Sequence, residues 1–287
     1  MPRRFKAGNM KLYLRVLVCA GLTAALVAAK PIVILHPDDT MYHPQPKAAA
    51  ANWQPARGRQ RLTLPVLGAV PRGYRYLGKM PTGVVLLVFG GAGNLIQRHD
   101  GAMRGFARFA SAVEWYDYRG YGYSSGQAHF EALQSDALRM FDAAARHAGP
   151  GGRIVVLGYS MGTAIADFVA LNRPVEGLIL AAPWSNYATA RAFTDGKHAY
   201  RLTLAAAKVV DEMAMVRNIA APLLVINGSK DDVIPPAQGR EVEAAAASTR
   251  KSFVQIPGAK HEWLMENSNV QSAVHAFLTS SGARKTR

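Results

Sequence analysis

Residues 154–162 read IVVLGYSMG, and this stretch decides the fold class. The apolar run Ile154–Leu157 is typical of a strand that is buried on both faces of a sheet. An Ala-rich stretch at 162–172 follows and predicts a helix. Between the two, the pattern G-x-S-x-G places Ser160 on a sharp strand-to-helix turn, where its hydroxyl is exposed above the sheet. The first N–H groups of the helix are then available to a developing oxyanion.

The same alternation of apolar strands and longer helices runs outward from this turn in both directions. Repeated strand–helix units with fully apolar strands predict an α/β fold, with a mostly parallel sheet of about eight strands and helices on both faces. The expected strands are 61–67, 74–77, 84–89, 112–118, 153–157, 178–181, 222–226 and 251–256. The expected helices are 95–109, 130–147, 162–172, 236–247 and 263–279.

A serine hydroxyl is a weak nucleophile at neutral pH, so a base and an orienting acid must lie beside it. In folds with this serine turn, the acid and then the base follow the serine along the chain. Asp231 follows the apolar strand 222–226, and His261 follows the next strand. Asp232 competes with Asp231 for the acid role. His275 lies in a predicted helix, where a packed or surface histidine is expected.

Five ordered motifs resemble those of the α/β-hydrolase superfamily, and within it those of the serine-aminopeptidase-like and membrane-anchored hydrolases. They are a loop similar to H-G-N-A-G-N at 89–94, D-x-R-G-x-G-x-S-x-G at 117–126, the serine turn at 158–162, G-x-x-D-x-x-x-P at 228–235 and G-x-x-H at 258–261. The resemblance covers about 61–280. One departure is Phe89, which occupies the place of the usual histidine; because the oxyanion hole uses backbone donors, activity is expected to survive this change.

The resemblance implies a role for each site residue. Ser160 would be the nucleophile, His261 the general base and Asp231 the residue that orients the imidazole; the family's spacing to Pro235 favours Asp231 over Asp232. The backbone N–H groups of Gly91 and Met161 would hold the oxyanion.

The segment 187–217 is where this fold inserts a short cap over the site. Trp184 and Trp263 lie on loops near the catalytic edge and are candidates for the substrate wall. No metal site or cofactor is expected, since no histidines or acids stand at metal-ligand spacing and no phosphate loop is present.

These residues predict a serine hydrolase that cleaves a carboxylic ester, thioester or small amide through an acyl-enzyme. Its partner would be a small acyl substrate. The alternative is a catalytically idle scaffold of the same fold that acts as a binding protein at the membrane.

The basic excess of the chain lies mainly in its tails. The net charge is +15, from 34 basic and 19 acidic residues. Residues 1–35 hold six basic side chains, the last eight residues hold three, and neither segment holds an acid; the 25 basic and 19 acidic residues of 36–279 leave +6. No reading helix or aromatic stacking sheet accompanies this charge, so nucleic acid is not expected as a partner.

The N-terminal segment has the layout of an export signal. An uncharged run of 14 apolar and small residues at 16–29 follows five basic residues, with Val27-Ala28-Ala29 as a cleavage site. Read over 12–35, the segment is long enough for an uncleaved membrane anchor. Either interpretation predicts an exported protein, membrane-anchored and facing the periplasm or exterior, or secreted after cleavage. A buried N-terminal helix of a cytosolic protein is the remaining alternative.

The expected organisation is therefore a signal peptide or anchor at 1–35, a linker at 36–60, a hydrolase domain at 61–280 and a basic tail at 281–287. Cys19 is the single cysteine, which excludes an intrachain disulfide.

Overall fold

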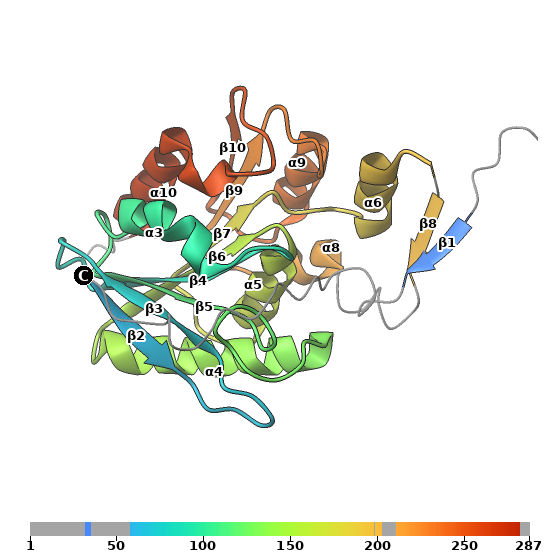
Figure 1. The fold of residues 1–287 in the computed structure, drawn as a ribbon. Helices are drawn as coiled ribbons and strands as arrows, with labels where there is room; N and C mark the ends of the chain where they lie inside the picture. Colours follow the sequence, from blue (N-terminus) through green and yellow to red (C-terminus); the bar gives the residue numbers. More distant parts are fainter. Residues whose placement is uncertain (1–31, 36–57, 198, 203–210, 282–287) are drawn as a thin grey trace, which may run out of the picture.

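Eight strands form the central sheet of the computed structural model, which describes residues 32–35, 58–197, 199–202 and 211–281 (Figure 1). β3 runs antiparallel to both of its neighbours, and all other neighbouring pairs are parallel. In spatial order the strands are β10 (Lys251–Ile256), β9 (Leu223–Gly228), β7 (Gly177–Ala181), β6 (Arg153–Tyr159), β4 (Val84–Phe89), β5 (Ala112–Tyr116), β3 (Arg72–Leu77) and β2 (Arg59–Thr63). The expected mostly parallel sheet of about eight strands is confirmed.

Helices cover both faces of the sheet (Figure 1). On one face, α3 (Asp100–Phe106) packs against α10 (Ser268–Ser281). The other face is covered by a row of four helices, each in contact with the next. They are α4 (Phe130–Ala148), α5 (Met161–Asn172), α8 (Glu212–Val216) and α9 (Pro236–Ala245). This is the two-sided covering that the apolar strands require.

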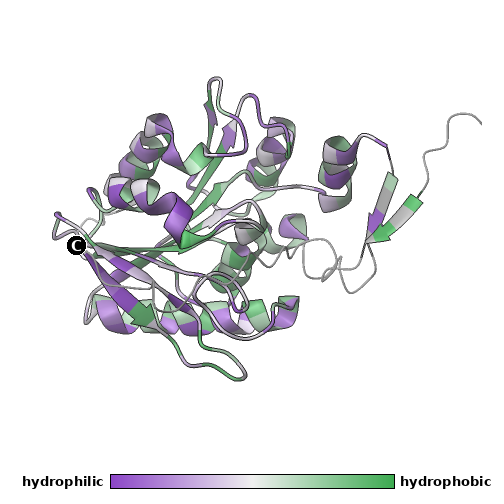
Figure 2. Ribbon diagram, in the orientation of Figure 1, coloured by the Kyte–Doolittle hydropathy of each residue, from purple (hydrophilic) through white to green (hydrophobic). Residues whose placement is uncertain are grey.

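The core lies between the sheet and these helices. Every residue of β4, β5, β7 and β9 is buried, and Figure 2 shows the central strands as hydrophobic. Burying one large apolar side chain stabilises the folded state by about 1.5–3 kcal/mol. Along α4 the buried residues recur at helical spacing, as Leu133, Ala137 and Met140 show. The core therefore fixes the strands whose carboxyl ends carry the candidate site.

Two expected helices differ in detail from the sequence-based expectation. The region predicted as one helix at 95–109 consists of the short 3-10 helix η2 (Ile96–His99) followed directly by α3. The last helix begins at Ser268 instead of 263, after the 3-10 helix η3 (Leu264–Glu266). Trp263 has a φ of 62°, a left-handed conformation that cannot start a right-handed helix.

The segment 187–217 carries α6 (Tyr187–Asp195), β8 (Ala199–Leu202) and α8. β8 pairs in parallel with β1 (Ile32–Leu35) to form a second, two-stranded sheet, which Figure 1 shows beyond α6 and apart from the central sheet. This pair differs from the expectation from sequence, which places residues 32–35 at the end of the N-terminal signal or anchor segment. Residues 1–31 and nearly all of the expected linker and basic tail lie outside the described residues, so the domain boundaries stay predictions.

Candidate active site

The turn between β6 and α5 holds Ser160 in a strained conformation, with a φ of 53° and a ψ of −123°. The Ser160 N–H donates to the carbonyl of Ala181 at 2.9 Å. The flanking glycines are required by close packing: a Cβ on Gly158 would lie 2.4 Å from the carbonyl oxygen of Gly162, and one on Gly162 would lie 2.1 Å from that of Phe89. Only a residue without a side chain fits at either place.

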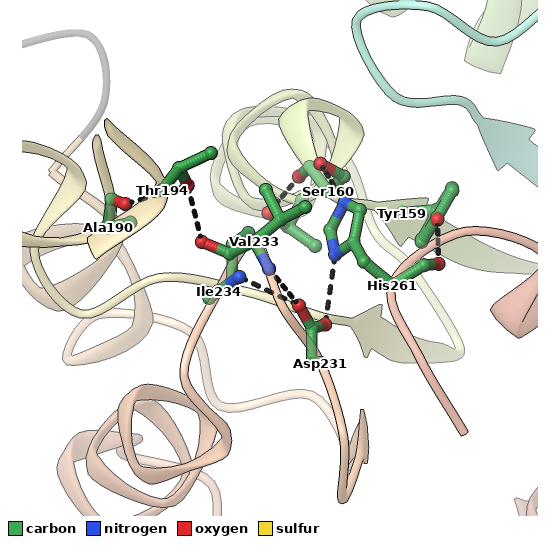
Figure 3. A network of polar contacts seen from close by, with 9 residues as sticks. Tyr159, Ser160, Ala190, Thr194, Asp231, Val233, Ile234 and His261 are labelled. Carbon is green, nitrogen blue, oxygen red and sulfur yellow. Dashed lines mark hydrogen bonds and ion pairs between the residues drawn. The ribbon is translucent and has the colours of Figure 1, made fainter. Parts of the chain in front are cut away.

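The structure brings Ser160, His261 and Asp231 together (Figure 3). They come from the loops that follow β6, β10 and β9, because the carboxyl ends of neighbouring parallel strands lie at one edge of the sheet. His261 Nε2 lies 3.0 Å from Ser160 Oγ, and His261 Nδ1 lies 2.9 Å from Asp231 Oδ2. The serine hydroxyl can therefore donate to Nε2 while Nδ1–H donates to the carboxylate.

Asp231 is fixed by its own loop. Its Oδ1 accepts hydrogen bonds from the backbone N–H groups of Val233 at 2.9 Å and Ile234 at 2.7 Å (Figure 3). Its side chain is fully buried, whereas the side chain of Asp232 is 57% exposed and forms an ion pair with Lys260 at 3.7 Å. Of the two adjacent carboxylates, only Asp231 contacts the histidine.

Tyr159 holds the backbone of the histidine loop. Its hydroxyl donates to the carbonyl of His261, and the two rings lie 5.3 Å apart between centroids. Burial raises the pKa of Tyr159, so its hydroxyl stays protonated and can donate this hydrogen bond. His275, by contrast, lies on α10 and stacks on Phe109 at 4.1 Å between ring centroids.

Gly91 and Met161 both lie beside Ser160. Met161 is the first residue of α5, and its N–H has no intrahelical acceptor. A Cβ built on Gly91 would lie 3.2 Å from the Ser160 Cβ and 2.4 Å from Asn94 Oδ1. The loop after β4 is held by Tyr118, whose hydroxyl donates to the carbonyl of Gly90 at 2.9 Å.

Asp117 holds the residues that follow the Gly91 loop. Its carboxylate accepts from the N–H of Ile96 at 3.0 Å and from that of Tyr123 at 3.3 Å. Burial raises the pKa of Asp117 to about 6, although the two backbone donors oppose this shift. The D-x-R-G motif is thus a structural turn, and its Arg119 forms two 2.7 Å hydrogen bonds with Asp136.

A series of polar side chains at the edge of the site, buried at His99 and partly buried at Asn94 and Glu266, could not be predicted from the sequence. His99 Nε2 lies 2.6 Å from Asn94 Nδ2, and His99 Nδ1 lies 2.6 Å from Glu266 Oε1. The imidazole also stacks on Trp115 at 5.3 Å between ring centroids. This series links the Gly91 loop to the segment after His261. No spacing rule could reveal it, since 167 positions separate His99 from Glu266.

A cavity of about 360 Å³ opens onto Ser160 and His261. Trp184 and Trp263 both line it; Trp184 is buried, and Trp263 is half exposed. Helix α6 supplies Tyr187, Ala190, Arg191 and Thr194 to the wall, and η2 supplies Arg98. The size is typical of small-molecule sites.

Among the residues that the structure describes, no three His, Cys, Asp or Glu side chains cluster as metal ligands would. Within these same residues, no helix is long and apolar enough to cross a membrane.

Comparison with known proteins places the chain in a family. The profile described as "Serine aminopeptidase, S33" matches residues 80–206 and 192–268. An uncharacterized protein of Mycobacterium tuberculosis is 30% identical over 204 residues, which cover 69% of this chain and 70% of that protein. Lysophosphatidylserine lipase ABHD12 of Macaca fascicularis is 25% identical over 195 residues, which cover 59% of this chain and 48% of the lipase. The chain thus spans about half the length of this animal relative.

Solved structures of hydrolases share the fold. An esterase of Pyrococcus furiosus superposes with a TM-score of 0.65 at 16% identity, covering 84% of this chain and 98% of the esterase. A soluble variant of monoglyceride lipase from Saccharomyces cerevisiae gives a TM-score of 0.64 at 13% identity, covering 80% and 97%. With the family profile matching most of the described domain, the chain belongs to the S33 serine aminopeptidase family of the α/β-hydrolase superfamily.

Proposed function

We propose that the protein is a serine hydrolase that cleaves a carboxylic ester, thioester or small amide through an acyl-enzyme. The observation that carries this proposal is the hydrogen-bonded series Ser160–His261–Asp231 at the floor of the 360 Å³ cavity. The family match and the lipase relatives support a hydrolase.

Each residue of the series has a defined step. Ser160 Oγ attacks the substrate carbonyl carbon while His261 Nε2 takes its proton. Asp231 stabilises the imidazolium, and the N–H groups of Gly91 and Met161 stabilise the oxyanion. His261 then gives its proton to the leaving group, and the acyl-enzyme forms. In the second half, His261 deprotonates a water molecule, which attacks the acyl-enzyme carbonyl carbon. The bond from this carbon to Ser160 Oγ then breaks, His261 returns its proton to Oγ, and the acid and the free serine are released.

Within these substrate classes, an ester with a negatively charged leaving group is favoured. Apolar side chains such as Trp184 and Ile234 line the cavity and suit an acyl chain, while Arg98 and Arg191 supply positive charge to its wall. The relative named lysophosphatidylserine lipase also acts on a single-chain lipid with an anionic headgroup. Glu262 lies in the same wall and would oppose a purely anionic group near it.

Covalent labelling tests the proposal. A fluorophosphonate probe should form an adduct with the purified protein, and the Ser160→Ala variant should form none, because the probe reacts with an activated serine. A panel of p-nitrophenyl esters of varied acyl length, run beside aminopeptidase substrates, would then rank the substrate classes. A properly folded protein without a Ser160-dependent adduct would overturn the enzyme proposal and favour an idle scaffold that binds at the membrane.

A further inference from the structure

A second buried polar cluster lies behind the nucleophile turn, on the side away from the substrate. It consists of Thr163 and Asp167 on α5 and Glu212 at the start of α8. All three residues are fully buried. Glu212 belongs to the cap segment, residues 187–217, whereas Thr163 belongs to the helix that begins directly after Ser160. The mechanism above uses none of these side chains.

The distances in this cluster require one proton more than the threonine can supply. Thr163 Oγ1 lies 2.5 Å from the carbonyl oxygen of Ser160 and 2.6 Å from Glu212 Oε1. Both contacts are short hydrogen bonds, and a hydroxyl has a single hydrogen to donate. The carbonyl can only accept, so Thr163 must donate to Ser160. The hydrogen in the second contact must then come from Glu212.

The surroundings of Glu212 favour this protonated form. Burial raises the pKa of Glu212 well above its usual value, and the nearby carboxyl of Asp167 raises it further. Hydrogen bonds from Thr163 and from the backbone N–H of Trp184 to an ionised Glu212 would lower its pKa, but they are smaller causes than burial. Among the described residues, neither Asp167 oxygen has a hydrogen-bond partner, and no cation compensates the pair. Two ionised carboxylates would be costly here.

We propose that Glu212 is a positioning residue that acts as a neutral carboxylic acid: it donates to Thr163, so that Thr163 donates to the carbonyl of Ser160 and fixes the nucleophile turn. Ser160 needs this support because its backbone is strained. The cap segment thereby reaches the nucleophile from behind as well as covering the substrate cavity through α6. This inference rests on the proposed role of Ser160 as the nucleophile.

Three substitutions in the full chain distinguish the effect of the hydrogen bond from Glu212 to Thr163 from the effect of side-chain packing. Glu212→Gln keeps the shape and two polar functions, an amide N–H that can donate to Thr163 and a carbonyl oxygen that can accept. Glu212→Leu removes both polar functions. Thr163→Val removes the hydroxyl and leaves α8 unchanged. It therefore still tests the inference if Glu212→Leu does not fold. Glu131→Gln, at an exposed position on α4, is the matched control.

We expect Glu212→Gln to retain kcat, and we expect the other two substitutions to lower kcat without changing KM. With a p-nitrophenyl ester, Glu212→Gln and Glu131→Gln should keep kcat within about twofold of the wild type, while Thr163→Val and Glu212→Leu should lose about tenfold, the effect of one hydrogen bond. KM should stay unchanged, because the substrate cavity is not altered. The rate of fluorophosphonate labelling should fall in parallel with kcat.

Infrared spectroscopy tests the protonation state without any catalysis. Burial also raises the pKa of Asp167, so the band of Glu212 is isolated in a difference spectrum. At neutral pH, the spectrum of the wild type minus that of Glu212→Gln should show the C=O stretch of one buried protonated carboxylic acid, and the wild type minus Glu131→Gln should show no such band. An unchanged band in Glu212→Gln, wild-type kcat in Thr163→Val, or a kcat in Glu212→Gln as low as in Glu212→Leu would each overturn the inference. Failure of the proposed function would differ, since the wild type itself would then form no adduct while the infrared result would still stand.

Discussion

At the scale of single residues, burial separates two carboxylates that are neighbours in the chain. Asp231 is fully buried, accepts two backbone hydrogen bonds and contacts His261, whereas Asp232 points to solvent beside Lys260. Hydrogen bonds to an ionised carboxylate are about twice as strong as neutral ones. A carboxylate in the place of Asp231 can therefore hold the imidazole with Nδ1 protonated and Nε2 facing the serine.

Replacing each aspartate by asparagine tests this difference. Asp231→Asn should lower kcat by a factor on the order of 10³–10⁴, because the amide can hold the histidine in the wrong tautomer. Asp232→Asn should stay within about twofold of the wild type, since an exposed ion pair contributes little. The measurement is ester hydrolysis by variants whose circular dichroism matches that of the wild type. Equal losses in both variants would contradict the assignment.

At the scale of elements, the central sheet could be predicted from the sequence, since its inner strands β4, β6, β7 and β9 consist mainly of apolar residues. The outer strands β2 and β3 carry several arginines and were predicted less accurately, because each begins two residues before its predicted start. The serine turn and the two later loops could also be placed, because each follows a predicted strand. The β1–β8 pair could not be predicted, since Ile32 pairs with Ala199 across most of the chain and neither strand alternates clearly. The contacts of His99 and Glu212 likewise depend on packing that local patterns do not encode.

The close packing of α5 against β4 can be tested at Gly162, with Gly101 in α3 as the control. Gly162→Ala should destabilise the protein by about 1–3 kcal/mol, because its Cβ would lie 2.1 Å from the backbone oxygen of Phe89. It should also lower activity, since the Gly91 loop begins at that point. Gly101→Ala, in the first turn of α3, meets no atom within 4 Å and should stabilise by up to about 1 kcal/mol.

Urea unfolding of both variants measures the difference, with the slope of the transition checked against that of the wild type. A Gly162→Ala protein of wild-type stability and activity would show that the turn can move away from β4, contrary to the close contact in the structure.

At the scale of the whole molecule, the N-terminal segment combines positive charge with an apolar run, as a membrane anchor does. Nine of the basic residues lie in the two tails, and 1–35 combines six of them with a long apolar stretch. Basic residues before a first span stay on the cytoplasmic side, while the rest of the chain crosses. β1 starts directly after this run and pairs with β8, which follows the α6 wall of the substrate cavity. An anchor at 1–31 would therefore hold the cavity close to the membrane.

Deleting residues 1–31 tests this arrangement while leaving β1 and the domain intact. The full chain should sediment with membranes and resist extraction by salt and alkaline carbonate, because residues 12–31, mostly apolar, have the length of roughly 20 residues that spans a bilayer. The shortened chain should be soluble and should hydrolyse a soluble p-nitrophenyl ester at the same kcat. On a monoacyl lipid ester presented in phosphatidylcholine vesicles, the full chain should be at least about tenfold faster, since anchoring raises the effective concentration of substrate. A full chain that is soluble at its complete intact mass would contradict the export and anchor predictions together, whereas a soluble chain whose mass lacks the segment up to Ala29 would identify a cleaved signal peptide.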